Sequence, residues 1–430
     1  MVLKLETKQA DFAARFARFI DASREVPNDV AQSVTSILND VRRRGDASLV
    51  ELTRRFDRHE LPLRVSDAEI DAAAGQVPQE TLDALDLAAR RIGDYHAKQT
   101  PSDVRFTDAQ GVELGFRWRA VTAAGLYVPG GTAAYPSSVL MNAIPARVAG
   151  VQRLVMTVPT PGGTLNPLVL AAAKRAGVSE IYRVGGAQAI AALAFGTATI
   201  APVDVVVGPG NAYVAEAKRQ VYGRVGIDMI AGPSEILVIA DGGNDPQWVA
   251  ADLLSQAEHD ESAQAILITD NAGFAQAVED AVEVALRLLP REAIARKSWD
   301  THGAIILVRS LDEAPALADA IAAEHVELLV ADADGLAGRI SHAGAIFLDA
   351  YTPEPIGDYV AGSNHVLPTG RRARFASGLS VFDFLKRTSL VRAGARGLEA
   401  IGPAAVTLAR AEGLEAHAQA VTLRLQKRNA

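Results

Sequence analysis

Apolar residues recur every three or four positions through residues 8–100, the spacing at which they share one face of a helix. Two such stripes are formed by Phe12, Phe16 and Phe19 and by Val34, Ile37, Leu38 and Val41. The pattern predicts a helix-rich amino-terminal part whose stripes are buried in a core. His59 and His96 stand among charged residues with no ligand partner three or four positions further on, so we assign both to the surface.

Through the middle of the chain, short apolar runs rich in β-branched residues alternate with helical patterns. Three of these runs end at Val158, Val184 and Val207, and each is followed by a turn and a helical segment. This alternation predicts βαβ units and a parallel sheet. Ligands of such sheets bind beyond the carboxyl ends of the strands, and Gln188 and Asn211 follow the second and the third run there.

A glycine-rich segment, residues 125–136, follows an earlier strand-like run. Its backbone N–H groups could hold an anion, and Tyr127 offers an aromatic face to a flat ring. The same segment could equally be a tight turn. The dinucleotide-binding fingerprint G-x-G-x-x-G is absent, so the glycines by themselves support a nucleotide site only weakly.

A second βα series begins near residue 234. One of its helical segments runs directly into a strand at Glu324-His325, and such junctions are where α/β proteins place reactive groups. The alternative for His325 is a basic residue that complements the carboxyl end of a helix.

Gln256 and His259 are three positions apart on a helical pattern that begins near Pro246, so they share one face of that helix. An amide oxygen and an imidazole can both bind Zn2+, but zinc takes about four ligands, and two from one helix are half a site. The alternative is a helix end with a satisfied histidine.

Residues 351–369 form a long stretch without a regular pattern, and loops of this length are usually functional. Asp358 and His365 are the polar candidates in this stretch. A helical pattern near the carboxyl end of the chain carries Glu412 and His417, roughly 140° apart around the helix, which still allows them to border one pocket.

The chain has 430 residues, a formal net charge of −8 and no cysteine. This length predicts two or more domains. The charges form no long run of one sign, which argues against a nucleic-acid stripe or a polybasic membrane patch. Without cysteine, disulfides and thiohemiacetal chemistry are excluded, and any metal must be held by N and O donors. The sequence shows no signal-peptide core and no apolar run of membrane-spanning length, so we expect a cytoplasmic protein.

Several segments, in matching order over most of the chain, resemble the histidinol dehydrogenase family. They are residues 125–131, 184–188, 208–211, 226–235, 253–260, 324–328, 357–359, 364–369, 377–387 and 412–417. Each segment is ordinary, but the joint match is very specific. The chain departs from the family at Ala323 and Ser363, where proline is common, and neither change removes a reactive group.

The resemblance implies an α/β fold of two incomplete Rossmann-like parallel-sheet domains, with helical terminal segments exchanged across a homodimer. The implied parts are an N-terminal helical arm (residues 1–23), a first α/β domain on the zinc and substrate side (24–120 and 239–378), a second, NAD-binding α/β domain (121–238) and a C-terminal helical tail that reaches the partner subunit (379–430).

The resemblance also implies an enzyme with one zinc per subunit that uses NAD to oxidise L-histidinol through L-histidinaldehyde to L-histidine, at the end of histidine biosynthesis. Glu324 and His325 match the family's catalytic pair, with His325 as the base and Glu324 activating water. The zinc ligands match Gln256, His259, Asp358 and His417. The substrate contacts match these four ligands together with Ser234, His325 and Glu412. The NAD contacts match Tyr127, Gln188 and Asn211.

Two other functions stay open. A related zinc- and NAD-dependent enzyme that oxidises another small hydroxy compound, such as a sulfonated diol, would keep Glu324 and His325. It would not need Glu412, so the presence of Glu412 favours histidinol. A non-enzymatic metabolite-binding protein with a structural metal would need neither the catalytic pair nor an open site of N and O donors.

Overall fold

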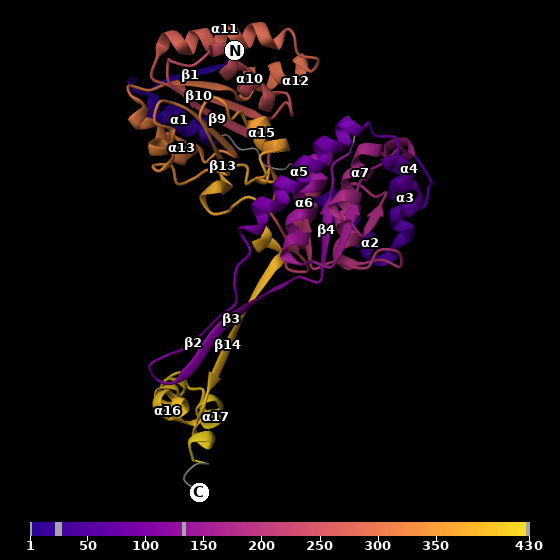
Figure 1. Ribbon diagram of the computed structural model, residues 1–430, viewed down its shortest axis with the longest axis vertical. Coiled ribbons are helices and arrows are strands. Elements are labelled where there is room, and N and C mark those ends of the chain that lie inside the picture. Colours follow the sequence, from indigo (N-terminus) through magenta and orange to yellow (C-terminus); the bar gives the residue numbers. More distant parts are fainter. Residues whose placement is uncertain (1, 22–27, 131–134, 427–430) are drawn as a thin grey trace. The chain divides into compact units, whose positions relative to one another are not determined.

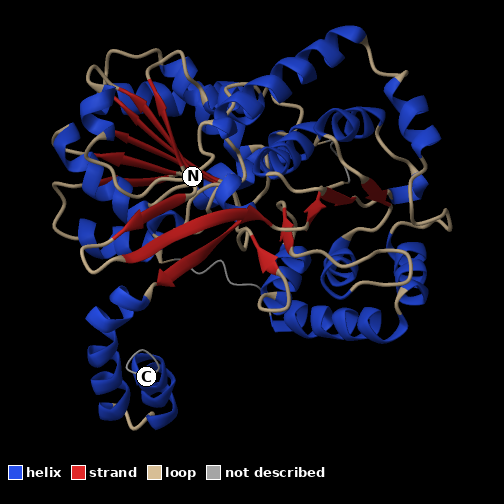
Figure 2. Cartoon of the chain, turned by 60° about the horizontal axis from the view of Figure 1, so that its bottom comes forward, coloured by secondary structure: helices blue, strands red, loops and turns tan. Residues whose placement is uncertain are grey.

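The computed structural model describes residues 2–21, 28–130 and 135–426, so part of the predicted glycine-rich segment, residues 131–134, lies outside the described residues. The chain divides into two compact units. The first comprises Met1–Lys98 and Thr122–Phe384, and the second comprises Gln99–Val121 and Leu385–Ala430. Both units mix helices and strands (Figure 2), which confirms the predicted α/β class. None of the described helices is long and apolar enough to span a membrane.

The first unit contains a six-stranded sheet, entirely parallel, in the order β1-β11-β10-β9-β12-β13. Its strands are β1 (Leu3–Glu6), β9 (Glu235–Ala240), β10 (Gln264–Thr269), β11 (Ala304–Leu307), β12 (His325–Leu329) and β13 (Ala345–Leu348). The helical elements of this part are α1 (Phe12–Ile20), α10 (Pro246–Ala257), α11 (Ala272–Leu286), α12 (Glu292–His302), η2 (Leu311–Glu313), α13 (Ala314–Ile321), α14 (Ala333–Ala337), α15 (Glu354–Tyr359) and η3 (Arg372–Arg374). The short helix η4 (Val381–Phe384) packs instead against α6 (Pro136–Ala149), a helix beside the second parallel sheet. Figure 1 shows α10, α11 and α12 on one side of the sheet and α1 and α13 on the other, with a buried apolar cluster on each side. Because both faces are covered, the central strands β9 and β10 contain continuous apolar runs at residues 236–240 and 265–268.

The first unit also contains a five-stranded parallel sheet in the order β6-β5-β4-β7-β8. Its strands are β4 (Ala123–Tyr127), β5 (Arg153–Thr157), β6 (Glu180–Tyr182), β7 (Val205–Val207) and β8 (Gly226–Ile227). The helical elements are α2 (Asn28–Arg44), α3 (Asp46–Phe56), α4 (Asp67–Ala74), α5 (Gln79–Ala97), α6 (Pro136–Ala149), η1 (Pro161–Gly163), α7 (Pro167–Ala176), α8 (Gly186–Phe195) and α9 (Ala212–Val221). The two sheets confirm the predicted βα alternation in both halves of the chain.

Helices α2 to α5 pack with the five-stranded sheet, whereas the resemblance grouped residues 24–120 with residues 239–378. Val34 of α2 shares one buried cluster with Ala191 of α8 and Ala217 of α9. Helix α4 packs against α7, and α5 against α6. The boundary expected after residue 238 also falls inside β9. An apolar stripe shows that one face of a helix is buried, but not which sheet buries it.

The second unit combines a three-stranded antiparallel sheet, in the order β14-β3-β2, with a helical hairpin. Its elements are β2 (Val104–Thr107), β3 (Val112–Ala120), β14 (Leu385–Ala393), α16 (Ala395–Ala411) and α17 (Glu415–Gln426). Leu385 pairs with Ala120 and Ala393 pairs with Val112, so this register joins two segments that are distant in sequence. Helices α16 and α17 pack on each other.

Both ends of the chain were expected to be helical, and both also contain a strand. In residues 1–23, β1 precedes α1 and pairs with β11. In residues 379–430, β14 precedes α16 and pairs with β3. Each strand is stabilised by a partner strand far away in the sequence, which local periodicity does not reveal.

His96 is fully buried, so its assignment to the surface was wrong. Its Nδ1 lies 2.8 Å from the backbone O of Ile92, and its Nε2 lies 3.4 Å from Nδ2 of Asn364. On the same helix, α5, Arg91 donates a hydrogen bond to the backbone O of Val360 at 2.6 Å. Helix α5 thus anchors the segment that follows α15.

Candidate active site

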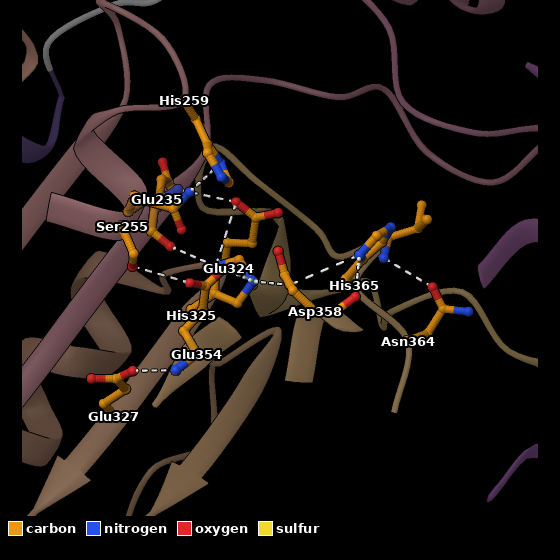
Figure 3. A network of polar contacts seen from close by, with 12 residues as sticks. Glu235, Ser255, His259, Glu324, His325, Glu327, Glu354, Asp358, Asn364 and His365 are labelled. Atoms are coloured by element: carbon orange, nitrogen blue, oxygen red, sulfur yellow. Dashed lines mark hydrogen bonds and ion pairs between the residues drawn. The ribbon is translucent and has the colours of Figure 1, made fainter. Parts of the chain in front are cut away.

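The predicted pair Glu324-His325 lies at the amino ends of strands in the six-stranded sheet. His325 is the first residue of β12, and it pairs with Ile236 of β9 on one side and with Ala345 of β13 on the other. Figure 3 shows the side chains of Glu324 and His325 together with those of Glu354 and Asp358 around one point. Ligands of open α/β sheets usually bind at the carboxyl edge, so the amino edge is an uncommon place for a site.

His325 is a buried, neutral imidazole. Its Nδ1 lies 3.0 Å from the backbone O of Glu235, so Nδ1 carries the proton and donates it. Its Nε2 therefore holds the lone pair, and this nitrogen has no hydrogen-bond partner among the described residues. Burial is the main cause that lowers the pKa of His325 to about 3, and the nearby imidazoles of His259 and His365 contribute to the same decrease. This geometry leaves Nε2 able to accept a proton from a ligand.

Glu324 and His325 are both hydrogen bonded to the backbone of Glu235, the first residue of β9. Oε2 of Glu324 accepts the N–H of Glu235 at 3.0 Å and lies 3.8 Å from Nδ1 of His325. The N–H of Glu235 thus holds one member of the pair and its C=O holds the other. Burial raises the pKa of Glu324 well above its ordinary value, so the ionised carboxylate is a stronger base than an exposed glutamate.

Gln256 and His259 meet, as their spacing predicted, although His259 lies just beyond the end of α10 at Ala257. Nε2 of Gln256 is 2.9 Å from Nδ1 of His259, and the N–H of His259 donates to the backbone O of Gln256 at 3.1 Å. Gln256 is fully buried, and its Oε1 has no hydrogen-bond partner in the described part of the chain. A buried amide oxygen without a donor is a group that a bound cation would satisfy.

Helix α15 lies inside the stretch 351–369, which was predicted to be irregular. A proline at its N-cap and another in its first turn favour a helix start. Glu354 and Asp358, four residues apart, therefore share one face. Oε1 of Glu354 and Oδ1 of Asp358 lie 3.9 Å and 3.8 Å from Nε2 of His325.

The carboxyl groups beside His325 favour a bound cation. Burial raises the pKa of Asp358 to about 6, and burial together with the charge of Asp358 raises the pKa of Glu354 to about 9. Two buried carboxylates repel each other, and a divalent cation would offset that repulsion. One donor atom each from His325, Glu354 and Asp358 lie within 4.8 Å of one another. These donors, with Oε1 of Gln256, are the N and O types that zinc accepts without a thiolate.

The three residues expected to contact NAD lie at the carboxyl edge of the five-stranded sheet. Tyr127 ends β4, and Asn211 caps α9 directly after β7, the neighbour of β4. Gln188 lies in the first turn of α8, which follows β6. The hydroxyl of Tyr127 accepts the N–H of Gly186 at 3.1 Å. The structure thus brings these residues to one edge of one sheet, beside helix amino termini.

The remaining expected substrate and zinc contacts lie in different units. Ser234 directly precedes β9 and is in the first unit with Glu324 and His325. Glu412 directly follows α16 as its C-cap residue, and His417 lies in the first turn of α17; both are in the second unit and both are exposed. The first unit therefore holds Gln256, His259 and Asp358, without His417.

The sequence patterns did not indicate Glu235, Glu327 or Glu354 as part of the site. Glu327 accepts the N–H of Glu354 at 2.6 Å, and its carboxyl group is hydrogen bonded to that of Asp252. For Glu354, a signal was present: it follows a proline and stands four residues before Asp358. Glu235 contributes through its backbone, which carries no sequence signal.

The fold and the site together define an α/β protein with two parallel sheets and a third, antiparallel sheet, in which a buried Glu-His pair lies among N and O donors that could hold a cation. The family model described as Histidinol dehydrogenase matches residues 21–425. Proteins named histidinol dehydrogenase from Rhodospirillum rubrum and Bradyrhizobium diazoefficiens are each 64% identical to this chain, and the matches cover 99% of this chain and 99% of each relative. The crystal structure of histidinol dehydrogenase from Elizabethkingia anophelis matches with a TM-score of 0.95 and 36% identity, over 100% of this chain and 99% of that chain. The chain belongs to the histidinol dehydrogenase family.

Proposed function

We propose that this protein uses NAD to oxidise L-histidinol through L-histidinaldehyde to L-histidine, the last steps of histidine biosynthesis. One observation supports this most strongly: Nε2 of the buried His325 has no described partner and lies beside Glu354 and Asp358, in a chain of this family. Oxidation of an alcohol requires a proton acceptor of this kind.

In this proposal zinc is held by Gln256, His259 and Asp358 of one chain and by His417 of a second copy, with one zinc per subunit. The buried Oε1 of Gln256 supports the first part, because it has no hydrogen bond from the described residues. The exposed position of His417 on α17 is compatible with a role in a second chain's site. When bound, zinc would hold and orient the imidazole and the amine of the substrate.

His325 acts as the base of the first oxidation. Its Nε2 accepts the hydroxyl proton of the substrate while the carbinol carbon loses a hydride to NAD. The bond from Nδ1–H to the backbone O of Glu235 strengthens as the ring becomes positive, so it stabilises the imidazolium that forms. The products of this step are the aldehyde, NADH and a proton on His325.

Glu324 acts in the second oxidation. An aldehyde has no hydroxyl proton to remove until water has added to it, and the chain has no cysteine that could form a thiohemiacetal instead. Glu324 accepts a proton from the attacking water, and the hydrate then loses a hydride to a second NAD. Over both steps, the alcohol and one water become a carboxylate, with two NADH and three protons released.

The remaining contacts select the substrate and NAD. Ser234 and Glu412 contact the substrate in this proposal, and the carboxylate of Glu412 suits the ammonium group of histidinol and repels a sulfonate. NAD lies against Tyr127, Gln188 and Asn211, whose common sheet edge and neighbouring helix amino termini suit its phosphates.

The proposal is tested by measuring NADH formation by the purified protein with L-histidinol. We expect two NADH per histidinol and histidine as the product, because the second oxidation follows the first at one site. A sulfonated diol is the matched control, and we expect no NADH from it. NADH from the diol alone would show the related enzyme instead, and no NADH from either compound by a zinc-loaded protein would indicate a binding protein.

Shared sites lead to a prediction about mixed dimers. His325→Ala and His417→Ala should each be inactive, but the two variants mixed and refolded should recover about a quarter of the wild-type activity, because half of the dimers are hybrids with one intact site. Activity of the mixture is measured after hybrid formation has been verified by mass. If verified hybrids show no activity, each chain builds its own site and the exchange of the tail is wrong.

A further inference from the structure

A buried ion pair braces the loop that carries Asn211. Lys218, near the end of α9, and Asp228, directly after β8, form an ion pair whose side chains are 2% and 1% exposed. Nζ of Lys218 also donates to the backbone O of Gly208 at 2.9 Å. Oδ2 of Asp228 accepts the N–H of Gly208 at 2.8 Å, and its Oδ1 accepts the N–H of Met229 at 2.6 Å. Both backbone polar groups of Gly208 are thus bound by this pair.

Gly208 is the point at which the loop turns against Tyr127. Its φ of +111° is a backbone conformation that suits glycine, and a Cβ at this position would lie 2.1 Å from the backbone O of Tyr127. Three residues further on, Oδ1 of Asn211 accepts the N–H groups of Tyr213 and Val214 and caps α9. The position of Gly208 therefore determines where the loop 208–211 and the start of α9 stand relative to Tyr127.

Stability alone is a weak reason for this pair. Burying two charges costs hydration free energy, which their mutual attraction only partly offsets. Apolar side chains of similar size often stabilise a core at least equally. Besides the contact between the two charges, Lys218 and Asp228 form hydrogen bonds with backbone groups of Gly208 and Met229. The geometry of the loop is what these contacts determine.

We infer that Lys218 and Asp228 are positioning residues for NAD. They hold the loop 208–211 against Tyr127 in the backbone conformation that binds the dinucleotide. This inference rests on the proposed function, because it takes Tyr127 and Asn211 as NAD contacts. Neither side chain needs to touch the dinucleotide, since both act through the backbone of Gly208.

The test compares Lys218→Met with the matched control Lys174→Met. Lys174 lies on α7 beside the same sheet and forms an exposed ion pair with Asp71. We expect Lys218→Met to bind NADH about tenfold or more weakly, on the scale of a lost hydrogen bond from a charged donor, and the KM for NAD to rise to a similar extent. The KM for histidinol and the zinc content should stay at wild-type values, and the control should match the wild type throughout.

Lys218→Met leaves Asp228 as an unpaired buried charge, which could prevent folding. A second variant therefore keeps the inference testable. Lys218→Met combined with Asp228→Asn removes both charges, and we expect it to fold with NADH affinity still reduced, since Gly208 has lost its ammonium donor. Wild-type NADH affinity in either folded variant would overturn the inference, as would a parallel loss of zinc and histidinol binding. If the wild-type protein itself binds no NADH, the proposed function fails first and this inference fails with it.

Discussion

Removing the metal from the purified protein is expected to lower kcat for L-histidinol by ~10³-fold or more, and added Zn2+ is expected to restore it. The reason is that a bound cation contributes several kcal/mol to orienting and polarising its ligands, and about 1.4 kcal/mol corresponds to a tenfold change in rate. Zinc content before and after dialysis against a chelator, measured by elemental analysis, should fall from about one per chain to none. Full activity of a metal-free sample would contradict the role of zinc.

Two variants then decide which donors hold the metal. His259→Ala should lose zinc, because it removes one of the four proposed ligands. Glu354→Gln should keep zinc, because Glu354 is outside the proposed set although its Oε1 lies 3.9 Å from Nε2 of His325. The reverse result, with zinc lost only from Glu354→Gln, would place the metal between His325, Glu354 and Asp358 instead.

Glu324→Gln is expected to slow the aldehyde step by ~10²-fold or more while keeping the fold, the zinc and some alcohol oxidation. Glutamine has nearly the same shape and keeps an oxygen that can accept the N–H of Glu235, so the backbone contact at 3.0 Å survives. It cannot accept a proton from water, and the second oxidation should therefore suffer more than the first.

Single-turnover measurement of NADH per histidinol checks this division of roles. The ratio should fall from two toward one in Glu324→Gln, and semicarbazide should trap the aldehyde that accumulates. A matched control is Glu258→Gln, a change at a partly exposed glutamate at the end of α10, which should keep the ratio of the wild type. If both oxidations slow equally in Glu324→Gln, then Glu324 orients His325, and another group activates the water.

The alternation of strands and helices could be predicted from the sequence because it belongs to the two parallel sheets, whose faces are covered by helices. In β9, residues 236–240 then form an uninterrupted apolar run, and the helices between the strands show the helical spacing of apolar residues instead. The contact between Gln256 and His259 was also predictable, since it depends on the geometry of one helix and the turn after it. The absence of cysteine, read directly from the chain, limited the metal donors to N and O.

The grouping of the helices and the convergence of the site were decided only by the tertiary structure. The apolar stripe that includes Val34 predicts a buried helix face. Only the tertiary structure shows that this face packs against α8 and α9. His325 bonds to the backbone O of Glu235 across 90 residues, because parallel strand register places the two side by side. Glu354 joins them through a short helix within a stretch that has no periodic pattern. Local spacing encodes which residues share a face of one element, whereas contacts between elements depend on register and packing, which no local pattern contains.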